Sequence, residues 1–204
     1  MKSFWQWSCI FLGSFIVSGC AVGPMTSHET ARTVGKGKFE GLGGLGQSGY
    51  FAKGHFGVTR RLDLGLELET LTFGARAKGT IFRQKNGWSV ASAFGFGGGS
   101  DNRYYYVDGI ASYFLGHWEP YGTLRYISGK ADLTELRSRE DATSLSFTTR
   151  KADFSYFQLM GGTRYWIDKN WLLSVEAATF LPVSTDFEVR DMLILSAAAG
   201  YRFR

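Results

Sequence analysis

Apolar and polar residues alternate with a period of two along most of the chain from residue 36 onward, and helical periodicity is almost absent. The clearest case is 62–69, Leu-Asp-Leu-Gly-Leu-Glu-Leu-Glu, with leucine at every second position. A strand places these leucines on one face, whereas a helix would spread them around its circumference. The pattern predicts ten strands, at 36–46, 49–60, 62–70, 73–84, 88–97, 104–115, 120–131, 153–166, 171–181 and 191–203.

The lengths of these strands and of their connections favour a membrane barrel. Strands in soluble proteins average about 5 to 6 residues, whereas a tilted strand needs about 9 to 11 to cross a bilayer. Most of the predicted strands reach that length. Short turns on one rim and longer loops on the other are typical of membrane barrels, with the turns in the periplasm. We expect an all-β fold, an antiparallel up-and-down transmembrane barrel of ten strands, or of eight if the glycine-rich first pair is irregular. The connections 59–62, 84–87, 115–119 and 168–170 are tight, and 97–103, 132–152 and 182–190 are longer.

Tryptophan gathers at one end of the predicted strands. Its ring is apolar and its N–H needs a partner, so it favours the membrane interface. We therefore predict an interface girdle beside the tight turns, made of Trp88, Trp118, Trp166 and Trp171. A second girdle is predicted at the other strand ends from Tyr50, Phe51, Phe73, Phe96, Tyr104 to Tyr106, Phe154 and Phe180.

The face opposite the apolar one carries charges of both signs. Charges inside a narrow barrel are costly unless they are paired, and Glu67 and Glu69 lie one strand away from Arg76 and Lys78, so cross-strand pairs are natural. We expect a lumen closed by an ion-pair network and not a diffusion pore. The predicted luminal residues are Lys53, His55, Asp63, Glu67, Glu69, Arg76, Lys78, Asp108, Arg125, Gln158, Arg164, Glu176 and Arg202.

Composition narrows the class further. The 204 residues carry a formal net charge of +5, which is mild and scattered, so no nucleic-acid partner is expected. The chain has no apolar run of 18 residues, which argues against a helical membrane bundle.

The first nineteen residues are expected to be a signal peptide. Lys2 is followed by a mostly apolar stretch that is too short for a spanning helix. The sequence Val17-Ser18-Gly19-Cys20 resembles the lipobox of bacterial lipoproteins. The resemblance implies cleavage before Cys20, diacylglycerol on its thiol, and, with Ala21 where an inner-membrane protein has Asp, sorting to the outer membrane. Residues 20–35 would form a lipidated tether. The alternative is a plain secretory signal with an incidental cysteine.

The last predicted strand alternates up to Phe203 and resembles the C-terminal targeting signature of outer-membrane β-barrels, although Arg204 follows the aromatic residue. The resemblance covers about 36–203. It implies the outer membrane of a Gram-negative-type bacterium, with outer-membrane lipids and the barrel-assembly and lipoprotein-sorting machineries as partners. An even number of strands would place the N-terminus in the periplasm.

No catalytic residue, metal or cofactor is expected. His28, His55 and His117 are too few and too scattered for a metal site. His55 with a serine and a carboxylate would suit a hydrolase, but the chain has no GxSxG elbow. The glycine-rich stretches 41–49 and 95–99 lack the Lys-Ser/Thr of a phosphate-binding loop.

The expected role is structural, envelope-maintaining or surface-binding, with an unknown surface ligand. The loop 132–152, rich in mixed charges, serine and threonine, is the candidate binding region. One alternative is an enzyme of acyl-hydrolase type that modifies outer-membrane lipid. Another is a lipid-tethered, lipocalin-like carrier, which would turn its apolar face inward around a ligand.

Overall fold

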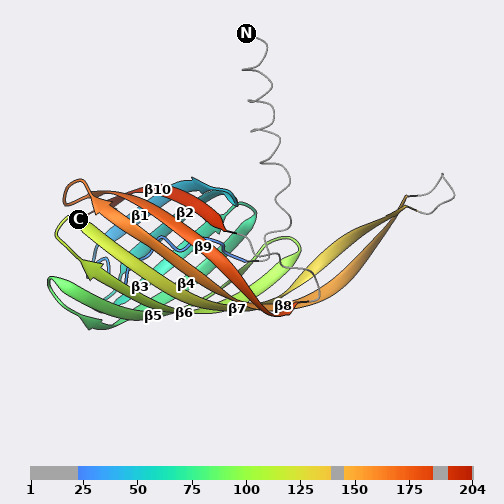
Figure 1. The fold of residues 1–204 in the computed structure, drawn as a ribbon, viewed down its shortest axis with the longest axis horizontal. Helices are drawn as coiled ribbons and strands as arrows, with labels where there is room; N and C mark the ends of the chain where they lie inside the picture. The colour runs from blue at the N-terminus through green and yellow to red at the C-terminus, as the bar shows by residue number, and fades with distance from the viewer. Residues whose placement is uncertain (1–22, 139–144, 186–192, 204) are drawn as a thin grey trace, which may run out of the picture.

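The computed structural model describes residues 23–138, 145–185 and 193–203, which form a closed antiparallel barrel (Figure 1). Neighbouring strands follow the order of the chain, and the barrel closes where β1 pairs with β10 over eight positions. The ten strands are β1 Phe39–Gly46, β2 Gly49–Gly57, β3 Leu62–Glu69, β4 Thr72–Arg83, β5 Gly87–Gly98, β6 Asn102–Phe114, β7 Trp118–Ser138, β8 Leu145–Trp166, β9 Trp171–Thr185 and β10 Ile194–Phe203.

The predicted fold class is confirmed, and the eight-strand alternative is wrong. The glycine-rich β1 and β2 are regular: they pair with each other from Phe39↔Phe56 to Gly46↔Gly49. Two bulges interrupt the ladders, between Thr80 and Phe82 and between Ser155 and Tyr156. The predicted strand centres agree with the structure because a half-exposed strand requires period-two alternation.

The barrel has two different rims. The turn rim carries the connections 58–61, 84–86, 115–117 and 167–170 as well as both ends of the barrel chain. The opposite rim, here the hairpin rim, includes the connections 47–48, 70–71 and 99–101, which are also tight. The loop predicted at 97–103 is therefore shorter than expected, and the difference between the rims rests on the β7–β8 and β9–β10 connections.

The loop predicted at 132–152 is mostly strand. β7 and β8 stay paired from Asp132↔Lys151 to Ser138↔Leu145, whereas β6 pairs with β7 only as far as Ala131 and β9 pairs with β8 only as far as Phe154. The two strands thus leave the wall as a free ribbon beyond the hairpin rim (Figure 1).

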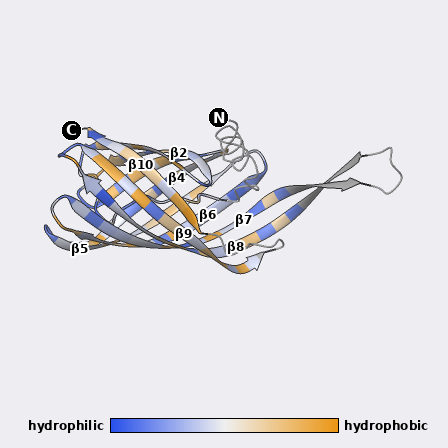
Figure 2. Cartoon of the chain, turned by 45° about the horizontal axis from the view of Figure 1, so that its top comes forward, coloured by the Kyte–Doolittle hydropathy of each residue, from blue (hydrophilic) through white to orange (hydrophobic). Residues whose placement is uncertain are grey.

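Apolar side chains face outward and ionic ones face inward along the walls. Leu64, Leu66, Phe94 and Val175 are about half exposed, whereas Asp63 and Glu67 on the same strand as the leucines are buried. Hydropathy accordingly alternates along the strands (Figure 2). This orientation is the reverse of the one that a lipocalin needs. Within the described part of the chain, no helix is long and apolar enough to span a membrane.

Candidate functional site

Residues 23–35 run through the inside of the barrel and are here called the luminal segment. The side chains from Thr26 to Ala31 are at most 2% exposed. The sequence predicts a lipidated tether at 20–35, of which 20–22 lie outside the described residues. Residues 23–35 instead lie within the barrel, because their polar groups find partners on most strands of the wall.

The segment begins near the hairpin rim. Gly23 lies against Tyr156 and Ile127, since a Cβ added to it would be 3.2 Å from the Tyr156 hydroxyl. The Glu69 carboxylate accepts hydrogen bonds from the backbone N–H of Met25 at 3.0 Å and of Thr26 at 3.3 Å.

One carboxylate and two cations hold the middle of the segment by its main chain. Glu176 accepts hydrogen bonds from the N–H groups of Ser27 at 2.7 Å and His28 at 2.6 Å. Lys53 Nζ donates to the carbonyl of Thr26 at 2.6 Å, and Arg164 donates to that of His28. Acidic wall residues thus bind amides and basic wall residues bind carbonyls, which satisfies backbone groups that would be costly to bury unpaired.

The segment ends at the turn rim. Lys78 Nζ donates to the carbonyls of Thr30 at 3.2 Å and Arg32 at 3.1 Å. The N–H of Val34 donates to Asp63 at 3.0 Å. The next turn is fixed to the end of β2, because the N–H of Gly37 donates to the carbonyl of Gly57 at 2.7 Å.

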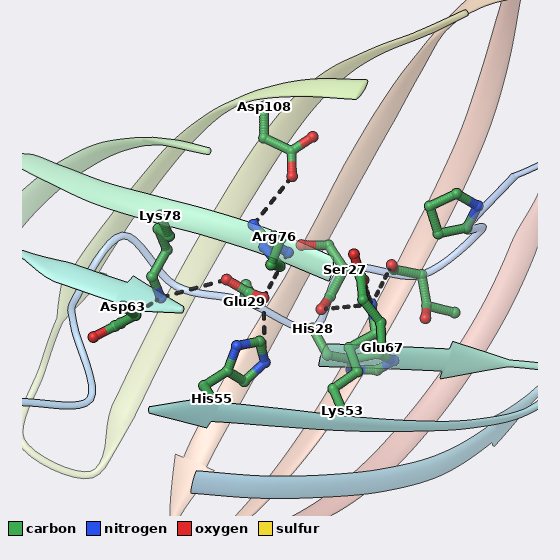
Figure 3. A network of polar contacts seen from close by, with 12 residues as sticks. Ser27, His28, Glu29, Lys53, His55, Asp63, Glu67, Arg76, Lys78 and Asp108 are labelled. Carbon is green, nitrogen blue, oxygen red and sulfur yellow. Dashed lines mark hydrogen bonds and ion pairs between the residues drawn. The ribbon is translucent and has the colours of Figure 1, made fainter. Parts of the chain in front are cut away.

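Glu29 is the ionic centre of the segment (Figure 3). Its carboxylate lies 2.6 Å from Arg76 Nη1, 3.3 Å from His55 Nε2 and 3.4 Å from Lys78 Nζ. The two wall cations extend this network to Asp108 and Asp63, each at 3.3 to 3.4 Å. A carboxylate contributed by the luminal segment therefore offsets cations of the wall at the middle of the lumen.

The His28 ring is held entirely by uncharged partners. Nδ1 lies 2.9 Å from Ser174 Oγ and Nε2 lies 2.8 Å from Ser196 Oγ, and the ring stacks on Phe51 with centroids 4.8 Å apart. Serine and histidine side by side resemble part of a hydrolase site. However, no carboxylate of the described residues forms an ion pair with the ring, and the whole group is enclosed in the lumen.

Further ion pairs join the wall to itself. Arg125 forms two hydrogen bonds with Asp108, at 2.7 and 2.9 Å. Glu40 on β1 binds Arg164 at 2.9 Å and Arg202 at 2.6 Å, which joins the first strand to β8 and β10. Lys53 lies 3.3 Å from Glu67, to which the Tyr106 hydroxyl also donates.

All thirteen predicted luminal residues lie on the inner face. Sequence reasoning missed two inward carboxylates, Glu40 and Glu119, and the contribution of the luminal segment through Glu29. Glu40 and Leu42 both face inward on β1, and most other residues of this strand are glycine. The alternation of apolar and polar residues is therefore weak in β1. Glu119 lies in a stretch that was interpreted as a turn.

Three of the four predicted girdle tryptophans point outward: Trp88, Trp118 and Trp171 are each about half exposed. Trp166 differs, because it is 8% exposed and its indole lies inside, with the Arg202 guanidinium 4.4 Å from the ring. The second girdle is also divided. Tyr50, Phe73, Phe96 and Tyr105 face outward, whereas Phe51, Tyr104, Tyr106, Phe154 and Phe180 are buried inside the barrel.

The histidines are dispersed in the structure as in the sequence. His55 is bound to Glu29 within the lumen, and His117 lies in a turn where its Nδ1 is 2.7 Å from the Trp166 carbonyl. Among the described residues, no group of three or more histidine, cysteine, aspartate or glutamate side chains is arranged to hold a metal ion.

Comparisons with known proteins give similarities of fold. No protein-family model matches the chain, and no curated protein matches it in sequence. Among solved structures, the N-terminal β-barrel domain of OprF from Pseudomonas aeruginosa is 10% identical, covering 81% of this chain and 96% of that one, with a TM-score of 0.42. The outer-membrane protein Ail from Yersinia pestis is 16% identical, with coverages of 82% and 100% and a TM-score of 0.40. The outer-membrane protease OmpT from Escherichia coli is 12% identical, with coverages of 87% and 99% and a TM-score of 0.48. The chain is a small closed barrel that resembles these proteins, and at such identities the likeness concerns the fold alone.

Proposed function

We propose that the chain is an integral outer-membrane barrel with a structural, envelope-maintaining or surface-binding role, whose lumen is kept closed by its own luminal segment. The observation that carries this proposal is the course of residues 23–35 through the barrel. About eight strands enclose an interior that side chains just fill, so ten strands leave additional central space. The luminal segment occupies that space here, and the arrangement favours a closed barrel over a pore.

The outer surface supports placement in a lipid bilayer. Large apolar side chains cover it on every strand, including Leu45 on β1 and Ile81 on β4, which are 70% and 67% exposed. Contiguous apolar patches on water-soluble monomers rarely exceed a few hundred Å². Acyl chains would cover this surface, and the outward tryptophans near the turn rim would lie at the interface.

The luminal segment changes the expected position of the N-terminus. With the turn rim in the periplasm, β1 begins there and β10 ends there. Residues 25–34 then lead back across the barrel, because Val34 binds Asp63 near the turn rim and Met25 binds Glu69 beside the hairpin rim. We therefore propose that the chain preceding Gly23 leaves the barrel at the outer surface of the cell, and not in the periplasm.

The same course would place the proposed lipid of Cys20 at the outer leaflet. Cys20 lies three positions before Gly23, so their Cα atoms are at most about 11 Å apart. Acyl chains on Cys20 would therefore insert beside the hairpin rim, and the protein would hold the outer leaflet both by its wall and by its lipid.

Labelling of intact cells with a membrane-impermeant maleimide tests this topology. Three single variants report on three positions: Val22→Cys before the luminal segment, Ser138→Cys at the end of β7, and Lys85→Cys in a turn of the turn rim. The unmodified chain is the control for a free Cys20 thiol. We expect Val22→Cys and Ser138→Cys to react in intact cells, and Lys85→Cys to react only after the outer membrane is permeabilised.

The outcomes separate the two parts of the proposal. If Ser138→Cys reacts in intact cells but Val22→Cys requires permeabilisation, the barrel is oriented as proposed and the surface exit of the N-terminus is wrong. If Lys85→Cys reacts in intact cells and Ser138→Cys does not, the orientation of the barrel itself is wrong.

The ribbon formed by β7 and β8 favours surface binding as the more specific role. It projects beyond the hairpin rim by seven residue pairs, about 20 Å at the usual rise per residue. An exposed two-stranded ribbon offers main-chain groups and side chains on both faces to a partner.

A further inference from the structure

The mouth of the barrel at the turn rim holds a cavity of about 660 Å³ that no part of the proposed function uses. This size lies within the range of about 300 to 1,000 Å³ typical of small-molecule sites. It is surrounded by the end of the luminal segment, the beginning of the barrel chain, the ends of β4 and β10, and the turns before β7 and β9. The cavity is therefore shaped by six parts of the chain.

Positive charge dominates the lining. Five cationic side chains face two carboxylates, an excess of three positive charges. The cations are Arg32, Lys38, Arg83, Lys169 and Arg202, and the carboxylates are Glu119 and Asp168.

Both carboxylates already have partners within the protein. Glu119 accepts hydrogen bonds from Ser112 Oγ at 3.3 Å and Trp166 Nε1 at 3.4 Å. Asp168 Oδ1 accepts hydrogen bonds from the N–H groups of Asn170 at 2.6 Å and Trp171 at 2.7 Å, which fixes the turn. Even with both carboxylates present, the lining keeps more cations than anions.

Two guanidinium groups are held in place by aromatic rings. Arg32 lies 4.1 Å from the centre of the Phe114 ring, and Arg202 lies 4.4 Å from that of Trp166. Arg202 is also paired with Glu40, whereas the Nη1 atom of Arg32 is buried without a hydrogen-bond partner. Planar guanidinium groups with fixed orientation suit the bidentate binding of phosphate oxygens.

We propose that this cavity binds a phosphate-bearing ligand at the turn rim, with Arg32 and Arg83 as the main contacts. The phosphate belongs either to a soluble oligophosphate or to the headgroup of an anionic phospholipid in the adjoining leaflet. Arg83 is exposed, and within the described part of the chain its hydrogen bond is from Nη1 to Thr33 Oγ1, at 3.3 Å. It can therefore turn toward a ligand without breaking an ion pair.

Titration of the full-length protein in neutral detergent tests the proposal by calorimetry. One series uses sodium tripolyphosphate, and a second uses nanodiscs of phosphatidylglycerol against nanodiscs of phosphatidylcholine. Saturable binding of tripolyphosphate is expected if the source is soluble, and a preference for phosphatidylglycerol if the source is a headgroup. The absence of both overturns the proposal.

Variants separate this site from general attraction to a basic protein. We expect Arg32→Gln and Arg83→Gln each to weaken binding about tenfold or more, because a charge-assisted bidentate contact is lost. Lys85→Gln is the matched control, since Lys85 lies on the same rim outside the cavity lining, and it should change binding less than about twofold. Equal weakening by Lys85→Gln would overturn the assigned site. Arg83→Gln keeps the test decisive if Arg32→Gln does not fold.

Discussion

At the scale of single residues, the lumen is organised around the carboxylate of Glu29. The inward charges of the wall could be predicted because each lies in phase on an alternating strand, as Lys53 and Glu67 do. Glu29 could not, because it lies in a short polar stretch without any period.

Replacement of Glu29 tests whether this carboxylate stabilises the barrel. Glu29→Gln leaves Arg76 and Lys78 buried with fewer counter-charges, and breaking a buried pair by removing one partner costs about 3 to 5 kcal/mol. We expect a clearly lower temperature for the conversion of the folded to the unfolded band on denaturing gels. Asp153→Asn is the control, because its pair with Lys130 is 76% to 78% exposed, and such pairs contribute little. An unchanged midpoint for Glu29→Gln would show that water or Asp108 replaces Glu29.

The glycines of the wall give a second residue-scale prediction. Gly95 faces inward, and a Cβ there would overlap the ring of Tyr106, whose hydroxyl donates to Glu67. Gly95→Ala should therefore displace that ring and lower the midpoint of unfolding. Gly79→Ala is the matched control, since nothing lies within 4 Å of its added Cβ. Equal midpoints for the two variants would contradict the role of Gly95 in accommodating Tyr106.

At the scale of elements, strands were predictable and their ends were not. Alternation gave β3 as Leu62–Glu69 almost without error, because both faces of that strand are uniform. Alternation did not predict the outer parts of β7 and β8, which continue as a ribbon beyond the wall. Residues there do not face lipid on one side and the lumen on the other, so their sequence does not need to alternate between apolar and polar. The luminal segment is tightly held but was not predicted. Most of its contacts are to its main chain, and such contacts place few requirements on which side chains the segment carries.

Shortening the ribbon tests whether the barrel depends on it. Replacement of residues 133–150 by Asn-Gly would join Asp132 and Lys151, which pair directly, through a two-residue turn. We expect the barrel to fold and its unfolding midpoint to change little, because the removed pairs contact no other strand. Heat-modifiable migration of the purified protein measures this. Loss of folding would mean that the ribbon is required for assembly of the wall.

At the scale of the whole molecule, the barrel and its luminal segment form one closed body. Pairing of β1 with β10 closes the wall, and Glu40 strengthens the seam through Arg164 and Arg202. A paired, ionic inner face was predictable from the near balance of charges on the inward positions. The position of the luminal segment at the centre was not predictable, because nothing in the local sequence indicates a contact between His28 and Ser196.

Conductance in planar bilayers tests the closure. The unmodified protein should give no steady ion-conducting steps. Replacement of residues 26–31 by glycine and serine keeps the length of the segment but removes the side chains of His28 and Glu29, and it should give measurable conductance. Heat-modifiable migration shows whether this variant is folded. A folded variant that conducts no ions would indicate that the wall side chains alone close the lumen.

The partners of the His28 ring have a consequence for how the molecule is made. Ser174 and Ser196 follow His28 by 146 and 168 positions, so the nascent chain has to be nearly complete before the imidazole can reach its final place. Contacts between such distant positions slow folding, because the loop between them has to close first. The luminal segment, although synthesised first, is thus among the last parts to reach its final position. Refolding from denaturant should end with a slow step in which β1 pairs with β10 while the luminal segment is enclosed.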